Sequence, residues 1–184
     1  MKVLVLHGSL ENRPESAEMR VISHLVQAVQ QKGLTAVRLE LSEAQIPLFN
    51  PTSPAVPEAV ISMCQTLKAA DVHIWFTPLY HGSMTGALKN ALDWVELTSA
   101  DPSPYLTGKI VALTCLSDGL HALQGINAMD AVAKSLRAWV LPFSVPVIKP
   151  SLFETDGTTI TDYYKSKFDQ LISMLAASGK LLQA

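Results

Sequence analysis

The segment DVHIWFTPLYHGSMTGALKNALDWV, residues 71–95, changes its hydrophobic period half-way along. Its first part, Asp71–Pro78, is almost continuously apolar, as is typical of a strand covered on both faces. Beyond Gly86 the apolar residues recur at helical spacing, at Leu88, Ala91, Leu92 and Val95. The segment therefore predicts a buried strand, a loop and an amphipathic helix, which together form one unit of an α/β sheet.

The same unit recurs along the whole chain. Four further apolar runs predict strands at Lys2–Gly8, Thr35–Leu41, Lys109–Ser117 and Ser144–Pro150. Helical periods follow each strand, within residues 22–29, 60–67, 129–140 and 164–175. Strict alternation predicts a flavodoxin-like three-layer α/β sandwich, with a five-stranded parallel sheet in the order 2-1-3-4-5. We expect one domain over residues 1–184, with the second and fifth strands near the edges.

Composition restricts the class of protein. Of the 184 residues, 48% are apolar and only 16% are charged, against a usual charged fraction of roughly 25%. Such a chain buries much of itself or covers part of its surface with another subunit, so we expect a homodimer or homotetramer. The net charge of -2 gives no bias towards nucleic acid or an anionic membrane. No apolar run reaches the roughly 20 residues that span a bilayer.

The two cysteines, Cys64 and Cys115, fit neither a zinc site nor a CxxC motif. One disulfide between them is the alternative to the arrangement that we expect, two free buried thiols in a reducing compartment, and with them a cytoplasmic location. The five histidines have no metal-ligand spacing, so no metal site is predicted.

Sheets of this order bind ligands beyond the carboxyl ends of strands one and three, where the strand order reverses. The first loop there is HGSLENRPES, residues 7–16. Gly8 permits a sharp turn, Ser9 and Ser16 carry hydroxyl groups, and Arg13 is a cation; together these suit a phosphate group. An ordinary turn with Ser16 as helix cap explains the same residues equally well. Neither a Walker loop nor GxGxxG is present.

The second loop is more specific. PLYHGSMTGALKNALDW, residues 78–94, resembles the motif P-x-Y-x-x-S-x-x-G-x-L-K-N-x-L-D-W of the NAD(P)H-dependent FMN reductase family. The resemblance implies bound FMN, with NADPH or NADH as cosubstrate. It also implies hydride transfer to FMN and on to a small-molecule acceptor: a quinone, an azo compound, a metal oxyanion or free flavin.

The resemblance also implies roles for individual residues. Ser9, Arg13 and Ser16 are similar to the group that holds the FMN phosphate. One residue departs from the pattern, because Glu11 stands where the family usually has arginine, and we expect its side chain to point to solvent.

Two further loops complete the predicted flavin site. The residues similar to those along the isoalloxazine ring are Pro78, Leu79, Tyr80, His81, Gly82 and Ser83. In the loop after the fourth strand, Ser117 and Gly119 resemble a segment at the pyrimidine end of the flavin. Asp118 and His121 are additional there; His121 either contacts a nicotinamide or acceptor, or is only solvated.

The flavin carries the chemistry in such enzymes, so no catalytic acid or base is assigned. Two alternatives remain open: an FMN-binding electron carrier, and a flavin-free scaffold of the same fold. Trp75, Trp94 and Trp139 are either core or interface residues. Our hypothesis places Trp94 or Trp139 at the subunit contact.

Overall fold

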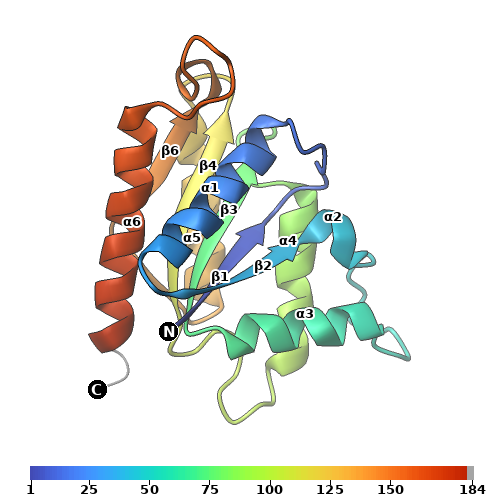
Figure 1. The fold of residues 1–184 in the computed structure, drawn as a ribbon. Coiled ribbons are helices and arrows are strands. Elements are labelled where there is room, and N and C mark those ends of the chain that lie inside the picture. The colour runs from blue at the N-terminus through green and yellow to red at the C-terminus, as the bar shows by residue number, and fades with distance from the viewer. Residues whose placement is uncertain (182–184) are drawn as a thin grey trace.

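The computed structural model describes residues 1–181, and the side chains of residues 1–178. Its sheet contains β1 (Lys2–His7), β2 (Thr35–Glu40), β3 (Val72–Pro78), β4 (Ile110–Ser117), β5 (Trp139–Val140) and β6 (Val145–Ile148) (Figure 1). The α-helices are α1 (Ala17–Gln31), α2 (Leu41–Ala44), α3 (Glu58–Ala69), α4 (Gly86–Asp93), α5 (Ala122–Ser135) and α6 (Asp162–Leu181). Two 3-10 helices, η1 (Trp94–Thr98) and η2 (Lys149–Ser151), follow α4 and β6.

The strand order is β2-β1-β3-β4-β5, and every pairing is parallel, as predicted for a flavodoxin-like fold. The outer position beside β4 is divided, because β5 pairs with its beginning and β6 with its end. The fifth predicted strand therefore consists of two short segments.

One helix prediction was too long. The periodicity over residues 129–140 predicted a helix through Val140, but α5 ends at Ser135 and Trp139–Val140 is a strand. Arg137 takes a left-handed conformation, with φ 64°, and two backbone bonds close the helix end: Arg137 N–H to the Lys134 carbonyl and Ala138 N–H to the Ala133 carbonyl. This is a Schellman motif in which arginine occupies the position that usually carries glycine.

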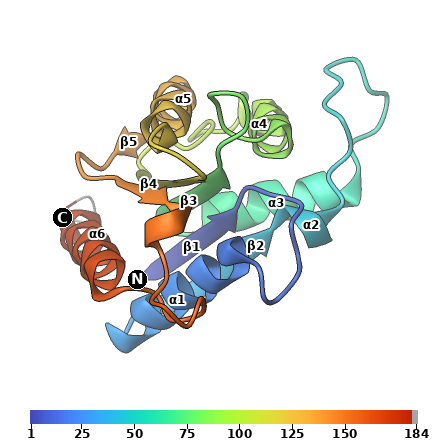
Figure 2. The same cartoon turned by 90° about the horizontal axis from the view of Figure 1, so that it is seen from above.

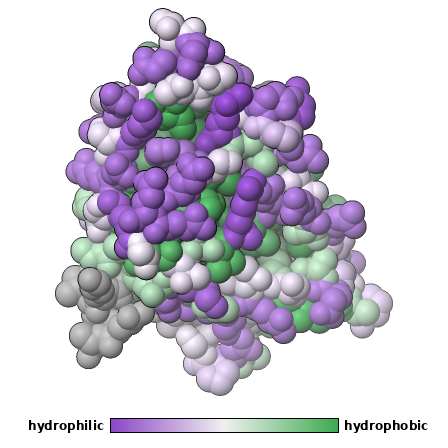
Figure 3. All heavy atoms as spheres, viewed as in Figure 1, coloured by the Kyte–Doolittle hydropathy of each residue, from purple (hydrophilic) through white to green (hydrophobic). Residues whose placement is uncertain are grey.

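Helices cover both faces of the sheet (Figure 2). α1 and α6 pack on one face, around Val3, Val5 and Phe76, while α3, α4 and α5 pack on the other, around Leu6 and Trp75. Side chains alternate between the two cores because successive strand residues point to opposite faces. The surface over α1 and α6 is mainly hydrophilic (Figure 3).

Burial decides the roles of the tryptophans. Trp75 and Trp94 are 0% and 2% exposed, so both are core residues. The hypothesis that Trp94 lies at a subunit contact is therefore wrong, because its ring is already covered within one chain. Trp139 is 66% exposed and stays a candidate.

The proline-rich segment after α2 projects from the body of the molecule (Figure 2). Its base is tied to α4 and η1: Phe49 N–H donates to Asn90 Oδ1 (2.7 Å), and the Pro47 carbonyl accepts from Asn90 Nδ2 (2.9 Å) and Trp94 Nε1 (2.8 Å). The asparagine and tryptophan of the LKNALDW motif thus hold this segment in place.

Both cysteines are free and buried, as predicted. Burial raises the pKa of the Cys64 thiol to about 11 and that of Cys115 to about 12. Among residues 1–181, no helix combines the length and apolar character that a membrane crossing requires.

Candidate flavin site

The loops after β1 and β3 cross at the carboxyl end of the sheet. Gly8 N–H donates to the Phe76 carbonyl (2.8 Å), and Thr85 Oγ1 donates to the Gly8 carbonyl (2.5 Å). A Cβ atom on Gly8 would lie 2.9 Å from the Phe76 carbonyl oxygen and 2.8 Å from Leu88 Cδ2. Only glycine fits this crossing, so Gly8 fixes how closely the two loops approach.

Backbone bonds define the loop after β3. Tyr80 and Ser83 exchange two hydrogen bonds, Tyr80 N–H to the Ser83 carbonyl (3.1 Å) and Ser83 N–H to the Tyr80 carbonyl (3.0 Å). The two residues between them both have positive φ, 48° at His81 and 78° at Gly82. This is the pattern of a type I′ turn, which holds Tyr80 at the rim, where the residue is 58% exposed.

Thr85 joins this turn to α4 and to the first loop. As helix cap it accepts a hydrogen bond from Leu88 N–H (3.0 Å), while its own N–H donates to Thr77 Oγ1 (3.2 Å). Both threonines are buried, so these bonds are shielded from water.

Side chains hold the loop after β1. Ser9 is 4% exposed and its hydroxyl oxygen accepts from Glu11 N–H (3.1 Å), while Ser16 caps α1 by accepting from Met19 N–H (3.2 Å). A hydroxyl group that accepts one bond retains its own hydrogen to donate. The cap role of Ser16 and a phosphate role are therefore compatible.

Glu11 corrects one expectation. Its carboxylate accepts from Arg13 Nε (2.9 Å) and from Arg13 N–H (2.9 Å) instead of pointing freely to solvent. These hydrogen bonds lower the pKa of Glu11 to about 2, and the carboxylate in turn raises the pKa of Arg13. The positive charge of Arg13 is thus already paired within its own loop.

Two cavities lie along these loops. One, of about 380 Å³, is lined by Ser9, Leu10, Glu11, Tyr80, Thr85, Gly86 and Ala87. The other, of about 90 Å³, is lined by Glu18, Pro78, Leu79, Tyr80, Leu116, Ser117, Asp118 and Lys149. Tyr80 lines both cavities and is the one residue that the two linings share.

The predicted site residues divide into two groups. Ser9, Pro78, Leu79, Tyr80 and Ser117 line one or both cavities. The residues that line neither are Arg13, Ser16, His81, Gly82, Ser83 and Gly119. Gly119, although in the second group, contacts Ser117 of the first group, because the Gly119 carbonyl accepts a hydrogen bond from Ser117 Oγ (2.5 Å). Their contact with a flavin stays a prediction.

Sequence reasoning missed Glu18, Lys149 and Thr85. Lys149 follows β6 and lies 3.4 Å from the Asp118 carboxylate across the smaller cavity. The sequence does carry a signal for this lysine, because it directly follows a strand that pairs with β4. Glu18 carried no comparable signal, because an acidic residue in the first turn of a helix is common for electrostatic reasons.

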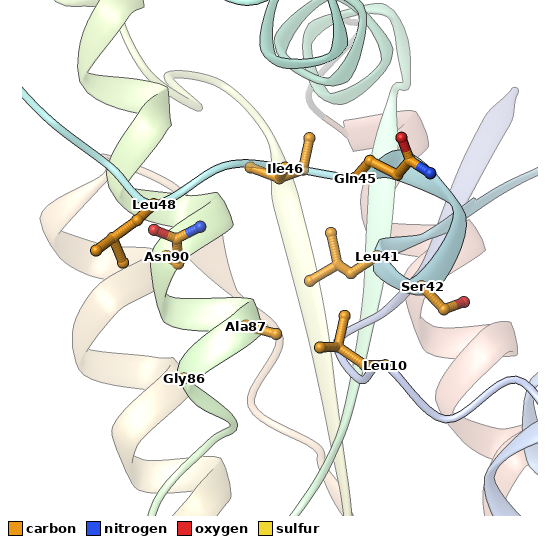
Figure 4. A pocket seen from close by; sticks show the side chains of 9 residues that line it. All are labelled: Leu10, Leu41, Ser42, Gln45, Ile46, Leu48, Gly86, Ala87 and Asn90. Atoms are coloured by element: carbon orange, nitrogen blue, oxygen red, sulfur yellow. The ribbon is translucent and has the colours of Figure 1, made fainter. Parts of the chain in front are cut away.

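A larger cavity, about 440 Å³, adjoins the first loop on the side of α2 (Figure 4). Leu10 and Leu41 point towards Ala87 of α4, and Ile46 and Leu48 complete an apolar wall. It shares Leu10, Gly86 and Ala87 with the 380 Å³ cavity. The base of the segment held by Asn90 therefore borders the site.

The residues present fit a flavin nucleotide. The narrow crossing at Gly8, the buried Ser9 hydroxyl group and the N–H groups of the first turn of α1 suit a phosphorylated chain. Pro78, Leu79 and Tyr80 offer an apolar rim for a flat ring. Among the described residues, no group of three or more His, Cys, Asp or Glu side chains is placed to hold a metal ion.

Residues 1–150 match the family model described as NADPH-dependent FMN reductase. The FMN-dependent NADPH-azoreductase of Staphylococcus aureus is 30% identical over 152 residues, covering 79% of this chain and 76% of that protein. The NADPH-dependent FMN reductase ArsH of Acidithiobacillus ferrooxidans is 28% identical over 121 residues, covering 62% of this chain and 51% of that protein. The chain thus spans about half of that relative.

A solved structure shares the fold. The flavoenzyme NAD(P)H:(acceptor) oxidoreductase FerB of Paracoccus denitrificans aligns with a TM-score of 0.73 at 21% identity, over 99% of this chain and 97% of that one. The family match covers β1 to β6 and includes both loops of the site. The chain belongs to the NADPH-dependent FMN reductase family.

Proposed function

We propose that this chain is an NAD(P)H-dependent oxidoreductase that binds FMN and passes a hydride from reduced nicotinamide to a small-molecule acceptor. The observation that carries the proposal is the backbone-bonded turn at residues 78–83, with Pro78, Leu79 and Tyr80 at its start, beside a hydroxyl-bearing loop at the point where the strand order reverses. A quinone, an azo compound, a metal oxyanion and free flavin are the acceptor classes that family membership supports.

Each loop has a separate task in this proposal. Ser9 and Ser16 donate to the FMN phosphate, and the first turn of α1 adds N–H groups. Arg13 reaches the phosphate only if it leaves Glu11 or bridges both groups. Pro78, Leu79 and Tyr80 pack along the ring system, and His81, Gly82 and Ser83 keep that rim in place.

At the other end of the ring, Ser117 and Gly119 border the pyrimidine edge. Lys149 brings a positive charge to the same cavity, although Asp118 balances it in part. When bound, FMN supplies the hydride-accepting and hydride-donating chemistry, with NADPH or NADH as its reductant. The protein supplies position and electrostatic environment, and no side-chain acid or base is assigned.

Oligomeric state, location and domain extent belong to the same proposal. A homodimer or homotetramer would cover exposed apolar groups such as Trp139, Leu120 and Leu48, which are 66%, 80% and 84% exposed. Two free buried thiols suit a cytoplasmic compartment. Residues 1–184 acting as a single FMN-binding domain stays a prediction.

The test is a flavin titration followed by turnover. Purified protein is titrated with FMN, and oxidation of NADPH and of NADH is then followed with and without a quinone. We expect flavin binding and nicotinamide oxidation that the quinone accelerates. Binding without oxidation would point to an electron carrier, and no flavin binding would point to a scaffold.

A matched pair of variants tests the phosphate group. Ser9→Ala should weaken FMN binding by about 1.5–3 kcal/mol, because one hydrogen bond to an anion is lost. Ser99→Ala, which removes an exposed hydroxyl group just after η1, should leave affinity unchanged. Equal affinities for the two variants would contradict the assignment of Ser9.

A further inference from the structure

Glu18 places a carboxylate in the predicted flavin site. It lies in the first turn of α1, two residues after the Ser16 cap, and its side chain is 12% exposed. It lines the 90 Å³ cavity with Tyr80 and Ser117. The carboxylate is therefore turned towards the sheet end and not towards bulk water.

A buried histidine fixes this carboxylate. His7, the last residue of β1, is fully buried, and its Nε2 lies 3.1 Å from Glu18 Oε2. The ring packs against Phe76 with centroids 5.7 Å apart, so neither partner of the hydrogen bond is free to swing away. His7 thus holds Glu18 at the end of β1, the point from which the chain continues into Gly8 and Ser9.

The hydrogen-bond geometry of His7 needs only one ring hydrogen, the one that reaches Glu18. His7 Nδ1 is buried and has no hydrogen-bond partner among the described residues. A neutral ring with its hydrogen on Nε2 donates to Glu18 and leaves only a lone pair unpaired at Nδ1. A second ring hydrogen, on Nδ1, would be a buried donor without an acceptor, which costs more.

The surrounding charges do not offset the carboxylate of Glu18. Between residues 8 and 20 there are three glutamates and two arginines: Glu11, Glu15, Glu18, Arg13 and Arg20. Arg13 is paired with Glu11, and the charges of Arg20 and Glu15 are opposite, so the five charges sum to −1. On the far side of the cavity, Lys149 faces Asp118. A phosphate dianion held by the first turn of α1 therefore meets a carboxylate whose charge this segment does not offset, whereas the flavin ring, beside the cavity that Glu18 lines, is uncharged.

We propose that Glu18, held by His7, is a specificity-determining residue that reduces the contribution of the ligand's phosphate to binding. The site then separates FMN from riboflavin by a smaller factor than the same loop would with a neutral residue at position 18. This inference rests on the proposed flavin-binding function. The inference predicts that the chain also binds flavins that lack the phosphate.

The test measures binding alone, by quenching of flavin fluorescence at low ionic strength, for FMN and riboflavin separately. The variants are Glu18→Gln and Glu18→Ala. The matched control is Glu15→Gln, which removes the same charge from an exposed side chain of the same loop. Circular dichroism and thermal unfolding confirm that each variant is folded.

Removal of one charge near a dianion should tighten FMN binding about five- to twentyfold. Riboflavin binding should change by less than about twofold, because it carries no charge for Glu18 to repel. The control should change neither, and salt should reduce the gain for FMN, because added ions screen the repulsion. Two neutral replacements of different size separate the charge from the shape of the side chain.

FMN affinity that is unchanged in both variants, or that rises in parallel with riboflavin affinity, would overturn the role of Glu18. The same gain in Glu15→Gln would also overturn it, because the effect would then be one of net charge. If the natural chain binds neither flavin, the proposed function itself fails and this inference fails with it.

Discussion

The loops after β1 and β3 meet at one end of the sheet, yet they are held in different ways. The β3 loop is closed by backbone bonds between Tyr80 and Ser83 and continues into the buried Thr85 cap. The β1 loop depends on side chains, chiefly the Glu11–Arg13 ion pair and the Ser16 cap. The first arrangement barely depends on salt or pH, whereas an exposed ion pair is screened by salt.

This difference separates two functions that a nucleotide site needs. A preformed rim loses little conformational entropy when a flat ring packs on it. A loop held by exchangeable side-chain bonds can reorganise, as Arg13 must do to reach an anion. We therefore expect the β3 loop to set the position of a ligand and the β1 loop to set its affinity and selectivity.

The largest expected effect is at the crossing of the two loops. Gly8→Ala places a methyl group against the Phe76 carbonyl, a backbone atom that moves only with β3. We expect a loss of about 2–3 kcal/mol in the free energy of unfolding, measured by urea denaturation. Gly86→Ala is the control, because its Cβ would meet nothing within 4 Å. Equal stability of the two variants would show that the two loops accommodate a Cβ atom at position 8.

A second effect comes from β3 itself, the strand that carries the rigid loop. Burial lowers the pKa of His73 to about 4, so the folded protein keeps this ring neutral while the unfolded chain protonates near pH 6.5. The stabilisation is complete above pH 6.5 and is lost as the pH falls towards 4. Linkage gives a loss of about 2 kcal/mol by pH 5, measured by urea denaturation across that range.

His24 acts in the same direction, because burial lowers its pKa as well. A His73→Phe variant should be less stable at pH 7.5, since the Leu67 carbonyl loses its hydrogen-bond partner. Its stability should nevertheless depend less on pH. A slope as steep as that of the natural chain would show that His73 is not the group responsible.

A smaller effect is expected where Thr85 ties the loops together. Thr85→Val keeps the shape of the side chain but removes the bonds to the Gly8 carbonyl and to Leu88 N–H. We expect a loss of about 1–2 kcal/mol in the free energy of unfolding and weaker binding of any flavin. Thr66→Val, on the exposed side of α3, should change stability by less than about 0.5 kcal/mol. Similar losses in both variants would mean that the hydrogen bonds of Thr85 stabilise the fold no more than that of Thr66.

The smallest effect is a gain. His81 has φ 48°, a region that costs most side chains energy and glycine none. His81→Gly should raise the melting temperature slightly, for a net gain of about 0.5 kcal/mol after the entropy of the unfolded chain is counted. Ser83→Gly, one step outside the positive-φ pair, should lower it instead. A loss at both positions would mean that His81 makes a contact that outweighs its backbone strain.

Much of the fold was predictable because local signals agreed with tertiary structure. The stop at Gly33 is an example, since its φ of 71° and the bond from Leu34 N–H to the Val29 carbonyl complete a Schellman motif that glycine favours. The helix end at Arg137 was not predicted, because no glycine or proline marks it in the sequence. Directly after it, Trp139 N–H donates to the Lys109 carbonyl of a distant segment, a tertiary contact with no local signal.

The site shows the same division. The positions of Pro78, Leu79, Tyr80 and Ser117 were predictable, because Pro78 and Ser117 end the buried strands β3 and β4 and the other two follow β3 directly. The sequence motif did not predict that Asn90 and Trp94 would both be used to hold Pro47, more than 40 residues earlier. The sequence also led to the prediction that the Glu11 side chain points to solvent, whereas in the structure it pairs with Arg13.

From the sequence alone came the alternation of strands and helices, because hydrophobic period is a local property that burial on both faces imposes. The parallel sheet and its strand order followed from the fold class that such alternation is typical of. Only the tertiary structure decided which charges face the site. His7 and Glu18, and likewise Asp118 and Lys149, lie on separate elements, and the distance between such side chains depends on how strands and helices pack. Coulomb interaction follows that distance and not separation along the chain.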